Sequence, residues 1–429
     1  MMIPQINIED YNYPLDEDRI AKYPLPRRDA SKLLLYDDGK VTESVFANLP
    51  SYIPERSLMV FNDTKVVPAR LHFVRPTGAR IEIFCLQPLE PGEYNLSFAQ
   101  EASCIWKCVI GNAKRWKNDI LALANPENDP IVERMGLKAE LLSREGETGT
   151  VRFFWDDGSA FSRVLEVCGT VPIPPYLDRE TEEIDTERYQ TLYAHIRGSV
   201  AAPTAGLHFT QNVLDELSAK GIDMQNVCLH VGAGTFLPVK DSDVSRHPMH
   251  REPFVVSRSL ISKLAAGDRE VTAVGTTSVR TLESLYYAGV HCIEDGSPRD
   301  IEQWEPYTRE YPYSTSEALG AIVKYLDDKG LDSLSLGTRI IIVPGFVFRI
   351  VDNLVTNFHQ PGSTLILLVS AFVGGDWQTI YRYALTHGFR FLSYGDSSLL
   401  KRRNLACELL FYLAKCPIFV DVLLRPETK

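Results

Sequence analysis

The pattern of apolar residues changes twice along this 429-residue chain, and these changes constrain its fold more than any other feature. Between about residues 71 and 160, short alternating segments are separated by glycine and proline, which is typical of a small barrel or sandwich. From about residue 161 onward, apolar runs alternate with amphipathic segments, which predicts strands followed by helices. The sequence therefore predicts an α/β main domain with an inserted all-β domain, a small β-barrel.

This pattern divides the chain into segments. A polar stretch at 295–335 is interpreted as an insertion with one helix near Ser316–Lys324. The segments are residues 1–70, the first part of the α/β domain; 71–160, the inserted barrel; 161–400, the remainder of the α/β domain; and 401–429, an apolar C-terminal extension.

Individual elements are expected where apolar runs meet turn residues or helix caps. Thr210, for example, is a suitable N-cap residue, and Gly221 follows the last turn of the helix that it would begin. We expect helices at Thr210–Lys220, Arg258–Ala266 and Ser278–Ala288, and strands at Leu33–Tyr36, Ser57–Asn62, Arg80–Phe84, Trp106–Ile110, Asp119–Leu123, Val151–Trp155, Val227–Val231, Val271–Val274, Arg339–Val343, Leu354–Asn357 and Leu365–Val369.

The charge balance restricts how this chain can meet nucleic acid. Lys and Arg number 45 against 56 Asp and Glu, so a net charge of −11 requires any such contact to use a local basic face. The polar N-terminal segment has no secretory signal, and no uninterrupted apolar run of about 18 residues predicts a membrane span. The 8 cysteines form no CxxC pair, which favours reduced thiols. We expect a cytoplasmic protein that makes no membrane contact.

Patches of small and hydroxyl residues, each with a His, Arg or Asp, lie at the expected ends of strands. In open α/β sheets, ligands bind beyond the carboxyl ends of the strands, so these patches are candidate site residues. They are Ala202–Phe209, Leu229–Phe236, Val274–Arg280, Thr356–Leu365 and Ser393–Asp396.

Val274–Arg280 gives the clearest physical argument among these patches. A strand is expected to end there and a helix to start, so hydroxyl and free N–H groups could bind a carboxylate or phosphate. Arg280 in the first helical turn opposes the helix dipole, and an anionic ligand would account for its position. The alternative is a capped helix with a surface arginine.

Several motifs leave their chemistry open. His208, His230 and His359 each lie in such a patch, and each could instead be a hydrogen-bonded core histidine. The H-x-x-H-x-E motif at 247–252 could bind a metal, but its spacing is not that of the HExxH zinc motif, so we favour a polar turn. Basic clusters at 27–28, 114–117 and 401–403 could follow an RNA backbone or be solvated surface.

Taken together, the motifs of this chain resemble one family. YPLPRRDASKLLLY, FNDTKVVPARL, GSVAAPTAGLHF, LHVGAGTFLPV, HPMHRE, AVGTTSVRTLES, DNLVTNFHQPGSTL and FRFLSYGD occur in this order up to about residue 397. In this order they resemble the S-adenosylmethionine:tRNA ribosyltransferase-isomerase family of queuosine biosynthesis.

The resemblance implies both a fold and a reaction. The family fold is an α/β domain with an inserted β-barrel. The reaction transfers the ribosyl part of S-adenosylmethionine to 7-aminomethyl-7-deazaguanine at the tRNA wobble position and isomerises it to epoxyqueuosine. Adenine and methionine leave, and the family uses no metal or separate cofactor, because S-adenosylmethionine is a co-substrate.

The chain departs from the family pattern in three places. Lys65 stands where the family usually has arginine, which keeps the charge and loses bidentate geometry. The stretch 295–335 is longer than in the shorter members, and the extension after residue 400 lies beyond the family pattern, so catalysis should not depend on it.

Roles follow from the chemistry of a sulfonium substrate. Histidines suit proton transfer near pH 7, and a carboxylate or an aromatic face can stabilise the cation. The expected catalytic residues are His208, His230, His359 and Asp396, with acid and base left unassigned. The expected substrate-binding residues are Thr204, Gly206, Gly232, Gly234, Thr235, Thr276, Thr277, Ser278, Arg280, Asn357, Ser363, Thr364 and Tyr394.

The partner implied is the tRNA anticodon loop that carries the aminomethyl base, which must be splayed out to react. Arg75, Arg80, Lys114, Arg115 and Lys117 of the barrel are the expected RNA-binding residues. We favour a monomer. The alternatives are an S-adenosylmethionine-dependent RNA methyltransferase and a non-catalytic RNA-binding module.

Overall fold

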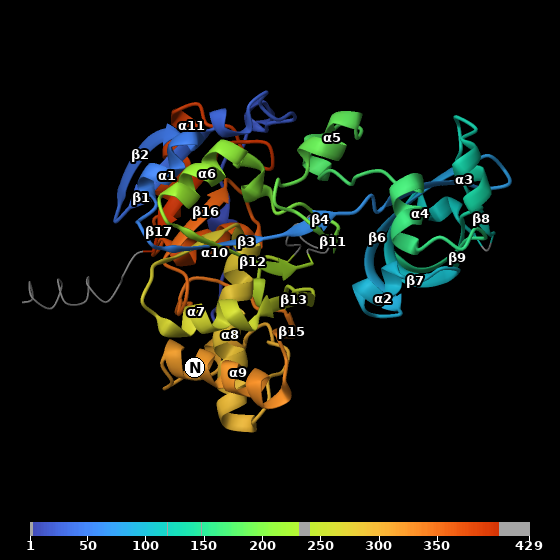
Figure 1. The fold of residues 1–429 in the computed structure, drawn as a ribbon. Helices are drawn as coiled ribbons and strands as arrows, with labels where there is room; N and C mark the ends of the chain where they lie inside the picture. Colours follow the sequence, from blue (N-terminus) through green and yellow to red (C-terminus); the bar gives the residue numbers. More distant parts are fainter. Residues whose placement is uncertain (1–2, 118, 147, 231–240, 403–429) are drawn as a thin grey trace, which may run out of the picture.

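A nine-stranded mixed sheet forms the centre of the main domain (Figure 1). The structure is a computed structural model that describes residues 3–402 except 118, 147 and 231–240. In spatial order the strands are β15 (Ser333–Thr338), β13 (Glu252–Ser257), β12 (Asp223–Leu229), β3 (Leu58–Asn62), β14 (Val271–Val274), β16 (Asn353–Asn357), β17 (Ser397–Lys401), β1 (Lys32–Asp37) and β2 (Lys40–Val45).

The central strands β12, β3, β14 and β16 are parallel. β3, β14 and β16 are buried along their whole length, which explains why they read as continuous apolar runs. β13, β17 and β2 each run antiparallel to a neighbour. The carboxyl ends of the four parallel strands therefore lie on one edge of the sheet.

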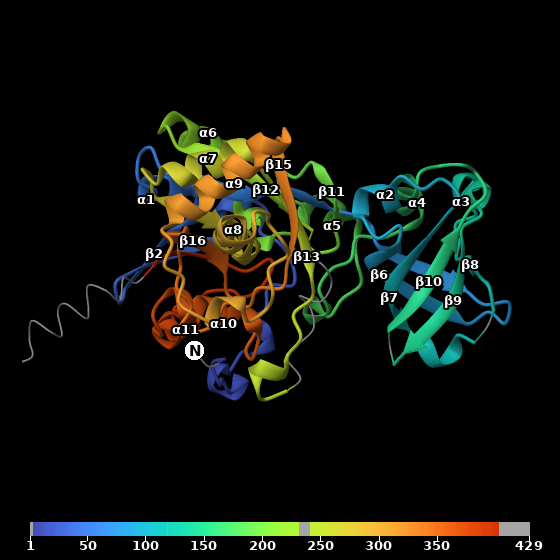
Figure 2. The same ribbon diagram turned by 90° about the horizontal axis from the view of Figure 1, so that it is seen from below.

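Helices cover both faces of this sheet (Figure 2). On one face, Val213 and Leu217 pack with Met59 and Phe61 of β3. On the other face, Leu285 of a long, mostly buried helix shares a core with Val60. The first face carries α1 (Leu49–Tyr52) and α6 (Gln211–Ala219), and the second carries α7 (Arg258–Ala266), α8 (Thr276–Asp295), α9 (Thr315–Lys329), α10 (Thr364–Phe372) and α11 (Trp377–Thr386).

A closed six-stranded antiparallel barrel stands beside the main domain (Figure 1). Its core includes Trp106 and Phe153, which are almost completely buried. Together with the mixed sheet, the barrel confirms the predicted fold class. Its strands are β5 (Arg70–Val74), β6 (Arg80–Glu90), β7 (Ser103–Gly111), β8 (Leu121–Leu123), β9 (Lys138–Glu145) and β10 (Thr148–Phe154), accompanied by α2 (Tyr94–Phe98), α3 (Pro130–Met135) and α4 (Phe161–Cys168).

The chain enters and leaves the barrel side by side. Arg70 N donates to Thr170 O at 3.3 Å, and Thr170 N donates to Arg70 O at 2.8 Å. Next to this bridge, β4 (Thr64–Val66) pairs in parallel with β11 (Ile196–Ser199) between the two domains (Figure 1). The barrel is therefore inserted into the main domain through two adjacent chain segments.

Most predicted elements form as expected, and two do not. The bounds of α7 and β14 match the prediction. Leu365–Val369 was expected to be a strand, but it belongs to helix α10, which is buried nearly all round and so shows no helical periodicity. Arg339–Val343 is irregular rather than a strand, and a side chain replaces a strand partner there: Tyr307 OH donates to Ile341 O at 3.1 Å and accepts from Val343 N at 2.9 Å.

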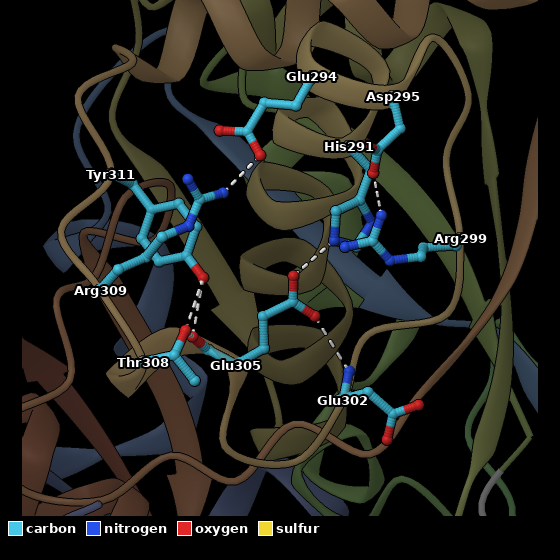
Figure 3. Close-up of polar contacts among 9 residues, drawn as sticks. All are labelled: His291, Glu294, Asp295, Arg299, Glu302, Glu305, Thr308, Arg309 and Tyr311. Atoms are coloured by element: carbon cyan, nitrogen blue, oxygen red, sulfur yellow. Dashed lines mark hydrogen bonds and ion pairs between the residues drawn. The ribbon is translucent and has the colours of Figure 1, made fainter. Parts of the chain in front are cut away.

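The polar stretch 295–335 is firmly attached to the main domain. Figure 3 shows His291 at the end of α8, where its Nε2 lies 2.5 Å from Glu305 Oε1, and Arg309, whose Nη2 donates to Glu294 Oε2 at 2.5 Å. Further along, the short helix α9 buries Leu319 and Ile322 in the main core. This stretch thus supplies part of the core, although its composition is polar.

None of the helices in the described part of the chain has the length and hydrophobicity that crossing a membrane requires. The described cysteines are free. The expected C-terminal extension falls almost entirely outside the described residues.

Glu283 of α8 is a buried carboxylate that accepts hydrogen bonds from three backbone N–H groups, and we predict that the fold depends on it. Glu283 Oε1 accepts from Ile350 N and Val351 N at 3.1 and 2.9 Å, and Oε2 accepts from Arg349 N at 2.8 Å. Glu283→Ala leaves these N–H groups unpaired, so we expect the free energy of unfolding to fall by about 3 kcal/mol or more in urea titrations. Glu310→Ala, at an exposed site, should change it by less than about 0.5 kcal/mol, and equal midpoints for the two variants would contradict the prediction.

Candidate functional site

Polar residues follow the parallel strands at the carboxyl edge of the sheet. Asp63 follows β3, His230 follows β12, and Gly275 follows β14. His359 lies two residues beyond β16, and Asp396 joins the same edge because β17, which it precedes, runs antiparallel to β16. The edge therefore gathers residues that are far apart in the sequence.

One cavity on this edge has a volume of about 90 Å³, and we call it the threonine cavity because Thr204, Thr276, Thr277 and Thr356 are among its lining residues. Gly275 has φ 88°, a conformation that favours glycine, and it lets β14 turn directly into α8. The predicted site residues Thr204, Thr276, Thr277, Asn357, His359 and Ser363 line it.

His359 is the ionisable histidine of the threonine cavity. Its Nε2 lies 3.0 Å from Thr356 Oγ1, and its backbone N donates to Tyr381 OH at 3.0 Å. Burial lowers the pKa of His359 to about 4, so the ring is neutral at pH 7 and can accept a proton.

A second cavity, of about 140 Å³, lies between the main domain and the barrel, and we call it the Arg280 cavity. Arg280 forms a buried ion pair with Glu252 of β13, and its Nε donates to Ile340 O at 3.1 Å. Its Nη2 is buried and has no partner among the described residues. A carboxylate of the protein itself thus pairs with Arg280, and one guanidinium nitrogen stays available, so the expected role of Arg280 in binding an anionic ligand stays a prediction.

The barrel supplies one wall of the Arg280 cavity. Tyr94 of α2 stacks on His230 with ring centroids 4.9 Å apart and an interplanar angle of 11°. Lys107 of β7 also lines the cavity. Burial lowers the pKa of His230 to about 4, so this ring is also neutral at pH 7. Residues of both domains therefore complete the cavity.

His247 and His250 line the Arg280 cavity as well. Burial lowers the pKa of both, and the charge of His250 adds to the effect on His247. Glu252, the third residue of the suggested metal motif, is paired with Arg280 instead. Among the described residues, no group of three or more His, Cys, Asp or Glu side chains could hold a metal.

His208 has both ring nitrogens occupied. Asn357 Nδ2 donates to Leu392 O and Ser393 O at 3.0 and 3.1 Å, so Asn357 Oδ1 accepts from His208 Nε2 at 3.0 Å. Nδ1 then accepts from the Ser31 hydroxyl at 2.8 Å. Burial lowers the pKa of His208 to about 4. These bonds hold His208 and Asn357 in place relative to each other, and the expected catalytic role of His208 stays a prediction.

Asp396 and Tyr394 also make internal hydrogen bonds. The carboxylate oxygens of Asp396 accept from Lys32 N at 2.9 Å and from Arg390 N at 2.7 Å. Tyr394 OH donates to Asp185 Oδ1 at 2.8 Å. Both side chains therefore hold segments of the chain together at the edge.

The remaining substrate-binding candidates are divided. Ser278 Oγ donates back to Val274 O at 2.7 Å within α8, so its hydroxyl is used in the helix. Gly206 lies in the 3-10 helix Thr204–His208, where a Cβ would come within 1.9 Å of Tyr193 OH. Thr364 lines the Arg280 cavity. Gly232, Gly234 and Thr235 lie outside the described residues.

The barrel candidates for RNA binding are mostly exposed. Arg80, Lys114, Arg115 and Lys117 are solvent-exposed, whereas Arg75 pairs with Asp119, to which its Nε donates at 2.6 Å. The neighbouring Trp116, expected at the same basic and aromatic surface, is buried in the barrel and donates from Nε1 to Asp119 O at 2.9 Å. This cluster thus offers cations and no stacking ring.

Sequence reasoning did not single out Asp63, a buried carboxyl at the carboxyl end of β3. Its side chain is buried, Oδ2 lies 3.3 Å from Nε2 of the exposed His195, and Oδ1 has no partner among the described residues. Burial raises the pKa of Asp63 to about 6, and His195 opposes this rise. The signal was available, because the polar residues Asn62, Asp63 and Thr64 follow a fully buried strand.

Comparisons with known proteins identify a family and several relatives. The family described as queuosine biosynthesis protein matches residues 8–400. The S-adenosylmethionine:tRNA ribosyltransferase-isomerase of Anaeromyxobacter sp. is 37% identical over 406 residues, which cover 93% of this chain and 100% of that protein. The protein of the same name from Citrifermentans bemidjiense is 36% identical over 399 residues, 92% of this chain and 99% of its own. A crystal structure of S-adenosylmethionine tRNA ribosyltransferase from Thermotoga maritima is 26% identical, covers 91% of this chain and 99% of its own, and superposes with a TM-score of 0.44.

The chain is thus an α/β domain with an inserted barrel, and residues of both line a cavity at the polar edge of the sheet. The chain belongs to the queuosine biosynthesis protein family, whose named members here are S-adenosylmethionine:tRNA ribosyltransferase-isomerases. The resemblance drawn from the sequence is confirmed. The matches favour the transferase over the methyltransferase and over the non-catalytic RNA-binding module.

The buried Asp63 should make stability depend on pH. Between the usual carboxyl value of 3.8 and about 6, the folded protein keeps a proton on Asp63 that the unfolded chain has released. Stability therefore falls as pH rises through this window. Asp63→Asn removes the fall, so we expect the variant to gain stability over the natural protein at pH 8 and to lose this gain near pH 4.

Urea titrations at pH 4, 6 and 8 measure this difference. Asp16→Asn, at an exposed site, is the control, and its effect on the free energy of unfolding should be the same at all three pH values. A gain for Asp63→Asn that is the same at every pH would show that the carboxyl titrates normally.

Proposed function

We propose that the protein transfers and isomerises the ribosyl part of S-adenosylmethionine onto 7-aminomethyl-7-deazaguanine at the tRNA wobble position. The product is epoxyqueuosine-tRNA, and adenine and methionine are released. The observation that carries this proposal is the pair of adjoining cavities at the sheet edge, which share Ser363 and Leu365 as lining residues. Two substrates can thus meet at one boundary.

The Arg280 cavity suits the methionine half of S-adenosylmethionine. Arg280 Nη2 is the unpartnered cation that would bind the carboxylate, and Leu365 and Leu368 provide an apolar wall for the side chain. Glu252 holds Arg280 in place through their buried ion pair. The adjoining threonine cavity is left for the ribosyl part and the aminomethyl base.

Proton transfer is assigned to groups that are free to perform it. The reaction needs a base for the C5′ proton or the aminomethyl ammonium and an acid for departing adenine. His359 and His230 line the two cavities and are neutral at pH 7, so each has a ring that can accept a proton. His208 and Asp396 are held by internal hydrogen bonds and position the chain, and Asp63 lines neither cavity and is given no role.

The tRNA would approach from the side where the two domains meet. Lys107 lines the Arg280 cavity. Because the net charge of the protein is −11, tRNA binding requires a local basic face, and the exposed barrel residues Arg80, Lys114, Arg115 and Lys117 offer one. We further propose a cytoplasmic monomer that acts on the anticodon loop and uses neither a metal nor a separate cofactor.

Incubation with labelled S-adenosylmethionine and tRNA carrying 7-aminomethyl-7-deazaguanine tests the reaction. Nucleoside analysis should find epoxyqueuosine, with adenine and methionine released in equal amounts. The activity should survive EDTA and exhaustive metal removal. Release of S-adenosylhomocysteine would identify a methyltransferase, and folded protein that leaves the nucleoside unchanged would contradict the proposal.

Arg280 tests the placement of S-adenosylmethionine. Loss of one charge-assisted pair to a carboxylate costs about 1.5–3 kcal/mol, so Arg280→Ala should weaken S-adenosylmethionine binding about 10- to 150-fold and leave tRNA binding nearly unchanged. Isothermal titration calorimetry measures both affinities.

Two further variants support this measurement. Arg280→Lys keeps a cation opposite Glu252 and should lose less affinity, which separates ligand binding from the cost of an unpaired buried carboxylate. Arg339→Ala removes a largely solvent-facing arginine of the same domain and should bind S-adenosylmethionine like the natural protein. An unchanged dissociation constant for Arg280→Ala would remove Arg280 from the site.

A further inference from the structure

A third cavity, of about 20 Å³, lies beside the threonine cavity, with which it shares Ser393. Arg28, Arg188 and Arg390 line it, together with His208 and Tyr394. Arg28 begins a short 3-10 helix, Arg188 ends α5 (Glu183–Arg188), and Arg390 precedes the β17 edge. The fold thus brings three guanidinium groups from distant parts of the chain to one place.

Two of these arginines are held by carbonyl groups rather than by carboxylates. Arg28 Nη1 donates to Gln190 O at 2.6 Å, and its Nη2 donates to Glu187 O at 3.0 Å. Arg188 Nη2 donates to Leu25 O at 2.6 Å. Within the described part of the chain, neither Arg28 nor Arg188 has a carboxylate within ion-pair distance, and Arg188 Nε is buried without a partner.

The acidic groups near this cavity are largely engaged elsewhere. Asp185 pairs with Arg179 at 2.7 Å, and Asp396 binds two backbone N–H groups and lies 3.7 Å from Arg390. Positive charge is therefore in excess. Burial, and then the charge of Arg188, lowers the pKa of Arg28, and Arg390 and Arg28 add to the burial that lowers the pKa of His208.

Lys401 and Arg402 of the basic cluster at 401–403 differ in this respect. Lys401 pairs with Asp37 at 2.9 Å, and Arg402 pairs with Asp352 at 3.0 Å. Those cations stabilise the fold by pairing with acids. Gathering unneutralised guanidinium groups costs electrostatic energy, and a bound anion repays that cost.

We propose that Arg28, Arg188 and Arg390 form a phosphate subsite that holds one backbone phosphate of the tRNA next to the nucleotide being modified. The inference rests on the proposed function. The cavity volume of about 20 Å³ exceeds the roughly 10–15 Å³ that one water-sized group needs, so it admits phosphate oxygens and excludes a whole nucleotide. Guanidinium forks match the oxygens of a phosphate, and the shared Ser393 sets that phosphate directly beside the threonine cavity.

The subsite explains how a splayed base could be held at the reaction site. Phosphate contacts fix the register and orientation of a nucleic acid, whereas base contacts select the nucleotide. A phosphate held here would stop the flipped nucleotide from sliding along the edge. Arg28, Arg188 and Arg390 therefore bind and position the tRNA, and they take no part in proton transfer.

Neutral phosphate replacement tests the proposal in the full chain. A set of anticodon stem-loop RNAs that carry the aminomethyl base receives one uncharged methylphosphonate linkage each, near the wobble position. For the natural protein, one linkage should weaken binding about 10-fold or more, because a charge-assisted contact is lost. For Arg188→Gln, unmodified RNA should already bind about that much more weakly, and the same linkage should have no further effect.

The salt dependence of binding gives a second readout that a merely structural role would not move. Each single-strand phosphate contact contributes about 0.7 to the slope of log K against log salt concentration, so Arg188→Gln should lower this slope by about that amount. Arg390→Gln is a second variant, because among the described residues the Arg390 guanidinium donates to no backbone carbonyl. Arg299→Gln, at a largely exposed site of the main domain, is the matched control and should keep the natural slope.

The outcomes separate this proposal from the proposed function. If the natural protein modifies the RNA, and the methylphosphonate penalties of Arg188→Gln and Arg390→Gln equal those of the natural protein, the subsite is wrong and the function stands. If either variant weakens S-adenosylmethionine binding and leaves RNA binding unchanged, the arginines bind the methionine carboxylate and the proposal is overturned. If free inorganic phosphate protects these arginines from chemical modification and RNA does not, the cavity binds free phosphate rather than a backbone phosphate of the tRNA, and the proposal is overturned.

Discussion

Parallel pairing of β12, β3, β14 and β16 is the constraint on which the rest of the structure depends. It places the carboxyl ends of four strands on one edge, so the polar residues that follow them meet there although they are far apart in the sequence. Helices cover both faces, which leaves the edge as the place where backbone N–H groups and polar side chains remain accessible. The threonine cavity, the Arg280 cavity and the third cavity, which Arg28, Arg188 and Arg390 line, all adjoin this edge.

The barrel contributes chemistry as well as surface. Tyr94 stacks on His230, and Lys107 lines the same cavity as Arg280, so the Arg280 cavity is incomplete without the inserted domain. The placement of cations at the boundary between the two domains is also compatible with the net negative charge of the protein. A chain with a net negative charge can bind tRNA when its cations are concentrated at one boundary, and in our proposal the guanidinium groups of Arg28 and Arg188 are kept free of carboxylate partners for that purpose.

The sequence predicted local structure well where caps and short apolar runs mark it. Arg258–Ala266 has a serine cap and a following glycine, and Val271–Val274 is a short buried run, so both were placed correctly. Leu365–Val369 failed because a helix buried all round has no polar stripe. The partners of a side chain were beyond reach: Glu252 meets Arg280, and Asn357 meets His208, through tertiary contacts alone. Asp63 was visible as a polar residue after a buried strand, but its raised pKa depends on burial that the sequence does not show.

The bridge between Arg70 and Thr170 has a consequence for how such a protein can arise and fold. These residues are 100 positions apart in the chain, yet their backbones are hydrogen-bonded. Seen from the main domain, the barrel is therefore an inserted loop whose two ends lie in contact. Folding of the barrel brings these ends together, so the entropic cost of closing the loop falls on the barrel rather than on the main domain. A module attached in this way can be exchanged or enlarged without breaking any strand pairing of the nine-stranded sheet.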